Sequence, residues 1–405
     1  MPLSALAAAS KSKVVVIGGG YGGATAAKYI RMLSQYRIDV TLVEPHAHFV
    51  SCPMSNLVVG GVRHLGDITW DYSNLSKNHG VKVVRDFADR IHANKRVVRL
   101  GSSKTLPYDK LVLSPGIELM THAIEGLDAA NSLGATIQAW KAGTDTLTLR
   151  KQLEAMPNGG TYVISIPLAP YRCPPGPYER ACMVAHYLKQ YKPRSKVIVL
   201  DANPEVTSKG ALFKAVWANQ YKGMVEYRPN HKVVGVDGKT KTLRFEFDDP
   251  LRAHVLNVLP DMRAGTLAIQ SGLANVNGRW AGVNFQTFES TVAPHVFVIG
   301  DAIQTAPLMP KSGHMANSQA KVAAAAIVSQ LSGWAPNPTP MLNNTCYSYI
   351  NNTQAMHITS VHRYDAQQKT FLSIDGAGGV SSAPSELEGL YAWSWAQTMW
   401  ADSLG

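Results

Sequence analysis

The chain has 405 residues, a formal net charge of +11 and four cysteines, and 45% of its residues are hydrophobic. At roughly 100 to 200 residues per domain, this length predicts two or three domains with ample core. The composition excludes a disordered, collagenous or coiled-coil chain. Four cysteines are too few for the disulfide scaffold of a small secreted domain. No apolar run approaches the roughly 20 residues of a membrane-spanning helix, so we expect no transmembrane segment.

The positive charge does not gather in one place. The 39 Lys and Arg residues are spread along the chain, and their densest cluster, within residues 189–196, is short. Proteins that bind nucleic acid carry such residues as a patch or stripe. We therefore expect no nucleic-acid partner, and a solvated basic surface that faces an acidic partner protein explains the excess. Residues 5–10 (ALAAAS) resemble the end of an export signal with its cleavage site, although a flexible N-terminus explains them equally well.

The first predicted elements form a dinucleotide-binding unit. A β-branched strand over residues 13–17 enters the glycine-rich run 18–23 (GGGYGG), and a helix over 24–33 and a strand over 39–43 follow. Gly18, Gly20 and Gly23 match G-x-G-x-x-G, and Glu44 ends the second strand, where it is placed to accept hydrogen bonds from a ribose. Such glycines let the backbone approach a pyrophosphate at the helix N-terminus, whereas a purely structural glycine-rich turn is the alternative.

A second unit of the same kind follows without the fingerprint. Strands are predicted over 81–84, 97–100 and 110–113, then a helix over 140–156, a strand over 161–166, an intervening helix and a strand over 196–200. The first turn of this unit, residues 167–176, reads PLAPYRCPPG and has no glycine triplet. Because prolines lack the N–H groups that cradle phosphates, we expect no NAD(P) site here.

The last third begins with a strand over 295–299 that ends in Gly300 and Asp301. Lys311 then precedes an alanine-rich helix over 316–331, and residues 333–340 form a proline-containing linker. The tail, 341–405, is rich in Tyr and Trp, and its segment 391–395 (YAWSW) alternates like a strand. Such aromatic residues fit either an interface or local core.

The fingerprint near the start, combined with a Gly-Asp pair near residue 300, resembles the two-dinucleotide-fold flavoproteins of the disulfide-reductase type. In that group the Asp, here Asp301, binds the ribityl chain of FAD, and the following helix points its positive end at the flavin. The resemblance implies an α/β protein with two Rossmann-like domains, of which the first binds FAD, and a small C-terminal α+β domain. Gly116 and Lys311 fall at further expected cofactor contacts, and a lysine there would favour an anionic reduced flavin.

Five segments narrow the resemblance to the flavoprotein subunit of flavocytochrome c sulfide dehydrogenase: 16–20 (VIGGG), 22–30 (GGATAAKYI), 172–181 (RCPPGPYERA), 309–313 (MPKSG) and 344–348 (NTCYS). The resemblance covers nearly the whole chain after the first dozen residues. It implies a periplasmic enzyme that oxidises sulfide to sulfur or polysulfide and passes electrons to a cytochrome c subunit. The chain has no C-x-x-C-H sequence, so the haem is expected on that partner.

The implied domains are an FAD-binding domain of residues 12–118 and 250–333, a second Rossmann-like domain of residues 119–249, and a C-terminal interface domain of residues 334–405.

The resemblance also implies roles for three of the cysteines. Cys52 resembles the cysteine that joins the 8α carbon of the flavin through sulfur, with a buried structural thiol as the alternative.

Nothing in their spacing pairs Cys173 with Cys346, but the resemblance implies a disulfide between them over the flavin. HS⁻ would attack one sulfur to leave a persulfide, and the other sulfur would depart as a thiolate able to pass electrons to the flavin. An ordinary stabilising disulfide is the alternative. Glu179 matches a glutamate suspected of acid–base work, or it is a solvated helix residue. Cys182 has no assigned role; we expect a buried thiol, with disulfide exchange as the open alternative.

His46 and His48 could bind a metal only with further ligands, so we read them as loop histidines and expect no metal site.

Three other functions remain as alternatives to a sulfide dehydrogenase. A sulfide:quinone oxidoreductase would need a membrane-binding C-terminal surface. An NAD(P)H-dependent disulfide reductase would need a second fingerprint, and a non-catalytic electron-transfer flavoprotein would keep its function without the cysteines.

Overall fold

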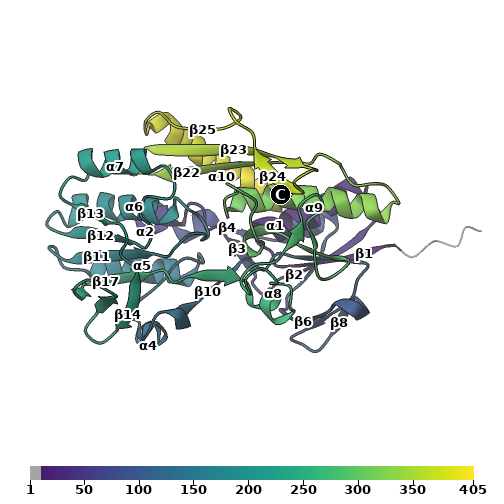
Figure 1. Cartoon of the computed structure of the whole chain (residues 1–405), viewed down its shortest axis with the longest axis horizontal. Coiled ribbons are helices and arrows are strands. Elements are labelled where there is room, and N and C mark those ends of the chain that lie inside the picture. The colour runs from purple at the N-terminus through teal and green to yellow at the C-terminus, as the bar shows by residue number, and fades with distance from the viewer. Residues whose placement is uncertain (1–10) are drawn as a thin grey trace, which may run out of the picture.

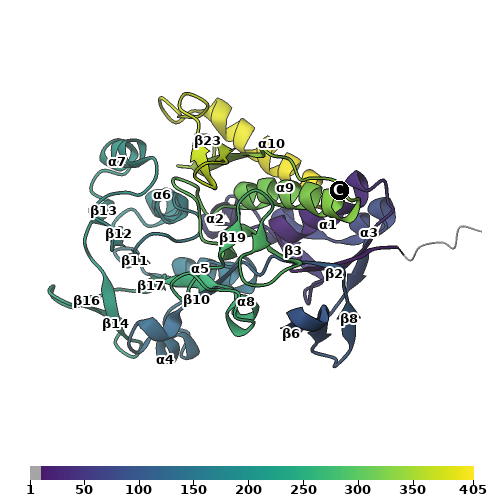
Figure 2. The same ribbon diagram turned by 45° about the vertical axis from the view of Figure 1, so that its right-hand side comes forward.

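A computed structural model describes residues 11–405, so the predicted export segment, residues 5–10, lies outside the described residues. Two sheets covered by helices lie side by side, and a C-terminal layer crosses both of them (Figure 1). Turned by 45°, the molecule still shows this layer on one side of both sheets (Figure 2). The predicted α/β class with two dinucleotide-binding-type units is confirmed.

The first sheet has seven strands in the order β19-β20-β21-β9-β1-β2-β5. Its centre is parallel, because β1 (Lys13–Ile17) pairs with β2 (Asp39–Val43) on one side and with β9 (Lys110–Leu113) on the other. The residues of β1 from Val14 onward are buried, as expected for a parallel strand covered on both faces. The other elements of this region are α1 (Tyr21–Leu33), β3 (His48–Val50), α2 (Ser55–Val59), β4 (Thr69–Asp71), α3 (Ser73–His79), β5 (Lys82–Val84), β6 (Ala88–His92), β7 (Val97–Leu100), β8 (Thr105–Pro107), β19 (Val283–Asn284), β20 (Glu289–Ser290), β21 (Val296–Val298) and α9 (Gly313–Leu331).

The turn between β1 and α1 needs glycine at two positions. Gly18 has φ +93°, a conformation that side chains rarely adopt. A Cβ on Gly23 would lie 1.8 Å from the carbonyl oxygen of Gly18. Helix α1 therefore starts inside the glycine run, at Tyr21, and its N-terminus lies tight against the carboxyl end of β1.

The second sheet has four parallel strands in the order β13-β12-β11-β17, which confirms the second βαβ unit. Its elements are β11 (Thr161–Ile166), α6 (Gly176–Tyr191), β12 (Lys196–Asp201), α7 (Gly210–Asn219), β13 (Val225–Arg228) and β17 (Val255–Val258), and around it lie β10 (Ile117–Leu119), α4 (Leu127–Ser132), α5 (Thr144–Ala155), β14 (Val233–Asp237), β15 (Thr242–Phe245), β16 (Leu251–Arg252), β18 (Met262–Ala264) and α8 (Thr266–Gln270). The helix predicted over 140–156 begins only at Thr144, because Gly143 has φ +150° and breaks the helical conformation.

At the end of β12, the acidic residue makes hydrogen bonds within its own domain. Asp201 is fully buried, and it accepts hydrogen bonds from Tyr178 Oη at 2.7 Å, Tyr227 Oη at 3.0 Å and the Asn203 side chain at 2.8 Å. In the first sheet the corresponding strand end carries Glu44 at the rim of a cavity. The second unit therefore uses its acid to hold its own core together, consistent with the missing glycine fingerprint.

The C-terminal layer consists of β22 (Met341–Tyr349), β23 (Ala355–Asp365), β24 (Thr370–Ser373), β25 (Gly379–Val380) and α10 (Glu386–Leu404). The strand expected over 391–395 is wrong, because these residues lie within α10. Ser385 accepts a hydrogen bond from the Glu388 amide at 3.2 Å and so caps this helix. None of the described helices is long and apolar enough to cross a membrane.

Candidate active site

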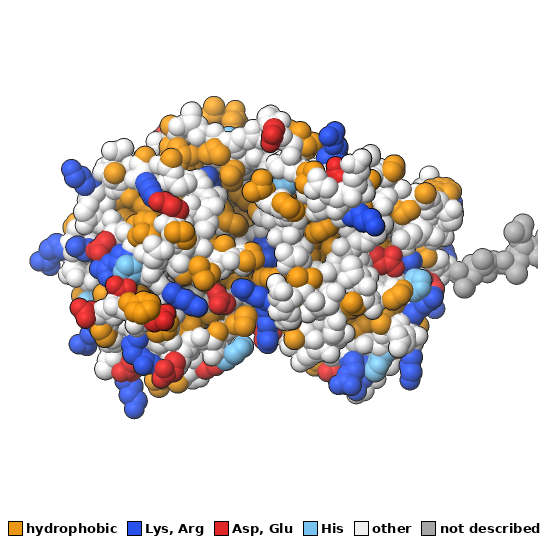
Figure 3. Space-filling view, viewed as in Figure 1, with side chains coloured by type: hydrophobic (Ala, Val, Ile, Leu, Met, Phe, Trp, Pro, Cys, Tyr) orange, Lys and Arg blue, Asp and Glu red, His pale blue; other side chains and the backbone are white. Residues whose placement is uncertain are grey.

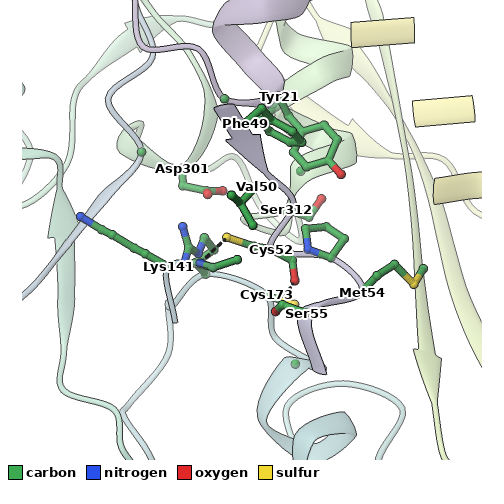
Figure 4. Close-up of a pocket in the computed structure, with 18 of the residues that line it drawn as sticks. Tyr21, Phe49, Val50, Cys52, Met54, Ser55, Lys141, Cys173, Asp301 and Ser312 are labelled. Carbon is green, nitrogen blue, oxygen red and sulfur yellow. Dashed lines mark hydrogen bonds between the residues drawn. The ribbon is translucent and has the colours of Figure 1, made fainter. Parts of the chain in front are cut away.

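A cavity of about 780 Å³ lies where the two sheets and the C-terminal layer meet. Its walls come from the start of α1, the Cys52 loop, the proline-rich turn after β11, the start of α9 and strand β22. Figure 4 shows residues from these distant segments, among them Tyr21, Cys52, Cys173, Asp301 and Ser312, facing one space. The cavity therefore gathers most of the residues that the sequence analysis singled out.

The dinucleotide end of the cavity is built from Gly20, Gly22 and Glu44. Gly18 and Gly23 do not line it, but they set the turn that brings Gly20 to its wall. A Cβ on Gly20 would meet nothing within 4 Å, so this backbone is open to a close-lying ligand. Glu44 accepts hydrogen bonds from the amides of Gly19 at 2.7 Å and His46 at 2.9 Å, and its role as a ribose acceptor stays a prediction.

His46 and His48 also line the cavity, at its rim, where both side chains are exposed. Among residues 11–405, no group of three or more His, Cys, Asp or Glu side chains is arranged to hold a metal ion. His46 lies in the loop after β2, whereas His48 begins β3, so the expectation of two loop histidines is wrong for His48. Both lie at the edge of a site that the sequence analysis did not connect with them.

Asp301 supplies the clearest sign that the cavity fits a polar ligand. It follows β21 in a short 3₁₀ helix (Gly300–Ala302) and lines the cavity beside Gly116. Within the described part of the chain, its Oδ1 is buried and has no hydrogen-bond partner. Burial raises the pKa of this carboxyl. A hydroxylated chain such as the ribityl group of FAD would satisfy this oxygen, so the residues present fit the expected flavin.

Lys311, in contrast, points away from the cavity. It is buried, it does not line the cavity, and its ammonium donates hydrogen bonds to the carbonyl oxygens of Asp301 at 2.9 Å and Ile303 at 2.6 Å. It also lies 3.6 Å from the ring centroid of Trp280. Burial lowers the pKa of Lys311 to about 7. Lys311 therefore supports the Asp301 turn from behind, and its role as a cofactor contact stays a prediction.

The N-terminus of α9 closes the same wall. Ser312 caps this helix by accepting a hydrogen bond from the Met315 amide at 3.0 Å, and Gly313 and His314 follow it along the cavity. The positive end of a helix dipole here favours negative charge in the cavity. His314 Nδ1 accepts a hydrogen bond from the Thr345 amide at 2.9 Å, and burial lowers the pKa of His314 to about 4.

Cys52 is half-buried and lines the cavity, unlike an ordinary buried structural thiol. Its sulfur accepts a hydrogen bond from the Ala142 amide at 3.5 Å and donates one to the Trp140 carbonyl at 3.8 Å. In Figure 4 the sulfur lies at the centre of the view, whereas the Lys141 side chain extends away from it. This thiol is thus accessible from the cavity and held in position by backbone groups.

Cys173 and Cys346 line the same cavity from two distant segments, and both are free thiols in the structure. Cys173 has a left-handed backbone with φ 59°, in the proline-rich turn that follows β11. Cys346 lies in β22, and its sulfur accepts a hydrogen bond from Asn344 Nδ2 at 3.4 Å. Burial raises the pKa of both thiols. A negative charge on Cys346 would raise the pKa of Cys173 further. The fold therefore brings together two cysteines that their spacing could not pair.

Glu179 is buried beside them, so it is not a solvated helix residue. Its carboxylate accepts hydrogen bonds from Asn56 Nδ2 at 2.7 Å and from the Tyr349 amide at 2.8 Å. Burial is the main cause that raises the pKa of Glu179.

Cys182 lies on the same helix as Glu179 but outside the cavity, and it is fully buried. Its sulfur accepts a hydrogen bond from Trp217 Nε1 at 3.3 Å. The expected buried thiol is confirmed there.

Several further residues of the site carried no sequence signal that we used. Trp140 and Trp395 line the cavity, although the first was predicted helical and the second in a strand. Arg180 is fully buried next to Glu179 and donates a hydrogen bond to Asn56 Oδ1 at 2.9 Å. The burial of Arg180 could have been predicted from the sequence, since an Arg directly after a Glu in an otherwise apolar helix suggests a paired, buried charge.

Three family models match the chain. Residues 12–154 match pyridine nucleotide-disulphide oxidoreductase, residues 146–260 match the central part of the sulfide dehydrogenase [flavocytochrome c] flavoprotein chain, and residues 338–404 match flavocytochrome c sulphide dehydrogenase, flavin-binding. Together these matches cover most of the elements that line the cavity.

Individual similar proteins point to the same group of sulfide-oxidising flavoproteins. The sulfide dehydrogenase [flavocytochrome c] flavoprotein chain of Chlorobaculum thiosulfatiphilum is 61% identical over 46 residues, which are 11% of this chain and 94% of that sequence. The mitochondrial sulfide:quinone oxidoreductase of Dictyostelium discoideum is 24% identical over 306 residues, 72% of this chain, and the match spans 65% of that relative's length. The sulfide:quinone oxidoreductase structure from Aquifex aeolicus superimposes with a TM-score of 0.80 at 19% identity, covering 97% of this chain and 91% of that one, which shows the shared fold.

Proposed function

The chain belongs to the flavoprotein chain family of flavocytochrome c sulfide dehydrogenase, and on that premise we propose that it is an FAD-dependent oxidoreductase that oxidises sulfide to sulfur or polysulfide. One observation carries the proposal. Cys173 and Cys346, which lie far apart in sequence, face one cavity together with a dinucleotide-type turn and a buried, unpartnered Asp301 oxygen. A binding protein without redox chemistry would have no need for two converging cysteines at that place.

In the proposed reaction, Cys173 and Cys346 form a disulfide in the oxidised protein. HS⁻ attacks one of the two sulfurs, the S–S bond breaks, that sulfur becomes a persulfide, and the other leaves as a thiolate. Bound FAD supplies a two-electron acceptor that can return electrons singly. Glu179 lines the same cavity as the pair, and burial raises the pKa of its carboxyl, so it is the candidate acid–base group of the reaction. Much sulfide is already HS⁻ near neutral pH, so the demand for a base is modest.

The chain's residues would hold the cofactor in three ways. Gly20 and Gly22 admit the pyrophosphate at the start of α1, Asp301 accepts from the ribityl chain, and Cys52 forms a thioether to the flavin. The test of the thioether is acid precipitation of the purified protein. Yellow flavin that stays in the pellet, with a mass shift on the Cys52 peptide, is the expected result, and flavin released into the supernatant contradicts the tether.

The central test of the proposed function is sulfide-dependent bleaching of the flavin absorbance in the complete protein. Cys173→Ser and Cys346→Ser should each abolish it, whereas Cys182→Ser, a buried thiol outside the cavity, serves as the matched control and should bleach normally. Bleaching that persists in both cysteine variants contradicts the proposed mechanism, and a non-catalytic electron-transfer subunit would explain it.

We further propose a haem-bearing cytochrome c subunit as electron acceptor and the periplasm as the location. The C-terminal layer offers exposed apolar side chains for docking: Val380, Leu387, Leu390 and Tyr391. Reduction of a soluble cytochrome c should be faster than reduction of a short-chain quinone, and cell fractionation should place the protein in the periplasm. Faster quinone reduction would favour a sulfide:quinone oxidoreductase, the second candidate, which the likeness to the Aquifex aeolicus structure and the helical form of α10 keep in view.

A further inference from the structure

Lys209 is a buried cation that none of the proposed steps uses. It is 6% exposed and directly precedes α7, where its backbone has φ 55°. This left-handed conformation is uncommon for a residue with a side chain. The side chain leaves the second sheet's region and ends in the C-terminal layer, against β22 and β23.

The partners of Lys209 are all neutral. Its ammonium donates hydrogen bonds to Ser348 Oγ at 2.7 Å, to the Cys346 carbonyl at 2.9 Å and to the Met356 carbonyl at 3.4 Å. Among residues 11–405, no carboxylate oxygen lies within 4.0 Å of it. A buried charge with neutral partners only is costly, so its retention next to a reactive cysteine calls for a physical reason.

The negatively charged groups around Lys209 explain why a cation is buried at this place. Burial lowers its pKa to about 8, and the charges that oppose this shift are those of Cys346 first, then Glu179, Cys173 and Glu388. They come from β22, α6, the proline-rich turn and α10, whereas β23 contributes the Met356 carbonyl. Two of these four groups are thiols that carry negative charge only when the cysteine pair is reduced.

We propose that Lys209 is the counter-charge of the cysteine pair, stabilising the thiolate that leaves when the Cys173–Cys346 disulfide opens. This inference rests on the proposed function, because it presupposes that disulfide. When HS⁻ adds to one sulfur, a new S–S bond forms, the old one breaks, and the departing sulfur keeps the electron pair as a thiolate. No proton has to be transferred, since Lys209 acts by charge and position rather than as an acid. It is therefore a positioning residue.

The inference predicts the number of protons taken up on reduction. Burial raises the pKa of both thiols, so the inference requires that Lys209 keep one thiolate against this effect: with Lys209 present the reduced pair holds one thiol and one thiolate, and without it two thiols. Exchange with dithiothreitol, whose thiols stay protonated between about pH 6 and 7.5, therefore releases a proton in the wild type. Its equilibrium constant should rise about tenfold per pH unit there, whereas in Lys209→Met it should stay level and lie at least about tenfold lower at pH 7.

The experiment uses the complete flavoprotein equilibrated with dithiothreitol redox buffers. Alkylation followed by mass analysis of the Cys173 and Cys346 peptides reads the cysteine pair, and flavin absorbance is read separately. Lys209→Arg should restore the pH dependence. Lys110→Met is the matched control, because Lys110 is also buried but lies in β9 away from the cavity, and it should behave as the wild type.

Glu179 is the other group that could take up the released proton, so the same pair of measurements is made in Glu179→Gln. A rise in the wild type that Lys209→Met removes in both backgrounds supports the inference. A level exchange constant in Lys209-containing protein of both backgrounds overturns it, even if Lys209→Met fails to fold. Two alkylated cysteines in the air-oxidised wild type would instead show that the disulfide does not form, which contradicts the proposed function and not the role of Lys209 alone.

Discussion

Asp301 presents a buried carboxylate oxygen to the cavity without a partner among the described residues. If the ribityl chain of the flavin satisfies it, Asp301→Ala should weaken flavin binding by about 10- to 100-fold, the worth of a hydrogen bond to a charged group. Because a thioether would mask this loss, affinity is measured by flavin fluorescence titration in a Cys52→Ser background. Asp128→Ala, an exposed acid in α4, is the control and should leave the affinity unchanged. Equal affinity in both variants would remove Asp301 from the cofactor site.

His314 makes the stability of the protein depend on pH. Burial lowers its pKa from 6.5 to about 4, so the unfolded chain binds a proton at a pH where the folded chain does not. The folded protein is therefore favoured fully above about pH 6.5 and loses this advantage as the pH falls toward 4, by roughly 2 to 3 kcal/mol. His314→Asn keeps an acceptor for the Thr345 amide and cannot be protonated.

Denaturant unfolding at pH 7, 5.5 and 4.5 measures this effect, and the variant should lose about 2 kcal/mol less than the wild type over that range. His254→Asn is the matched control, since His254 Nδ1 also accepts a backbone N–H, from Thr161 at 3.0 Å, but on an exposed side chain. Parallel pH curves for His314→Asn and wild type would contradict the role assigned to burial.

At the scale of single residues, the sequence indicated the chemistry better than the directions of side chains. Asp301 and both cysteines of the pair lie in the cavity, because Asp301 follows a strand end, Cys173 lies in a stiff turn and Cys346 lies within β22. Lys311 lies in the predicted place but faces backward onto Trp280, a contact between distant segments that no local pattern announces. Lys209 was missed for the same reason, since its partners lie on a sheet formed far along the chain.

Helix α10 shows how an element can be misread. The alternation at 391–395 favoured a strand, but the buried residues of the segment follow helical spacing, namely Gly389, Ala392, Ala396, Met399, Trp400, Ser403 and Leu404. The cap was readable in advance, because Ser385 followed three residues later by Glu388 is a capping-box sequence. Local start signals were therefore more informative here than a five-residue alternation.

The exposed face of α10 carries a prediction about docking. Leu390 is 70% exposed, and a charge there should weaken an apolar contact with the cytochrome subunit. We expect Leu390→Glu to raise the KM for the cytochrome about tenfold, a typical loss at an interface position, while sulfide still bleaches the flavin at the wild-type rate. Leu133→Glu is the matched control, because Leu133 is 63% exposed beside α4. Equal values of KM in the two variants would place the interface elsewhere.

Close packing of α10 makes a second prediction. A Cβ on Gly389 would lie 1.8 Å from the Thr353 carbonyl oxygen, so the helix must move to admit any side chain. Gly389→Ala should lower the free energy of unfolding by about 1 to 3 kcal/mol. Thermal unfolding is compared with Gly379→Ala, where a Cβ would meet nothing within 4 Å. If both variants unfold at the same temperature, α10 is not held as tightly as its contacts indicate.

For the whole molecule, the +11 charge is the property that a partner would sense at a distance. On the face shown in Figure 3, Lys and Arg are interspersed with acidic and apolar side chains rather than gathered into one stripe. Such a surface gives long-range attraction to an acidic protein without a fixed anion site. Reduction of an acidic cytochrome c should therefore be faster than reduction of a basic one at low salt.

This advantage should fall as ionic strength rises toward 0.5 M, because the screening length is already about 10 Å at 0.1 M. Stopped-flow reduction of the two cytochromes over a salt series measures it, with the sulfide half-reaction as the control that salt leaves unchanged. A basic cytochrome that reacts faster at low salt would contradict the expectation.

At this scale the two parallel units and their order were predictable, since each is announced by a strand, a turn and a helix in sequence. The position of the C-terminal layer was not, because it depends on contacts between segments hundreds of residues apart. The predicted boundaries, 12–118 with 250–333, 119–249 and 334–405, remain predictions for limited proteolysis to test.

The hydrogen bond from Trp400 Nε1 to Tyr21 Oη, 2.9 Å long, joins the last helix to the cofactor turn at the start of the chain. Ser403 likewise contacts Thr25 at 3.0 Å. The wall of the cavity beside Tyr21 is thus finished only when α10 docks, after residues as late as Trp400 have been synthesised. Because this closing step is non-local, we expect it late in folding, and with it the enclosure of the flavin.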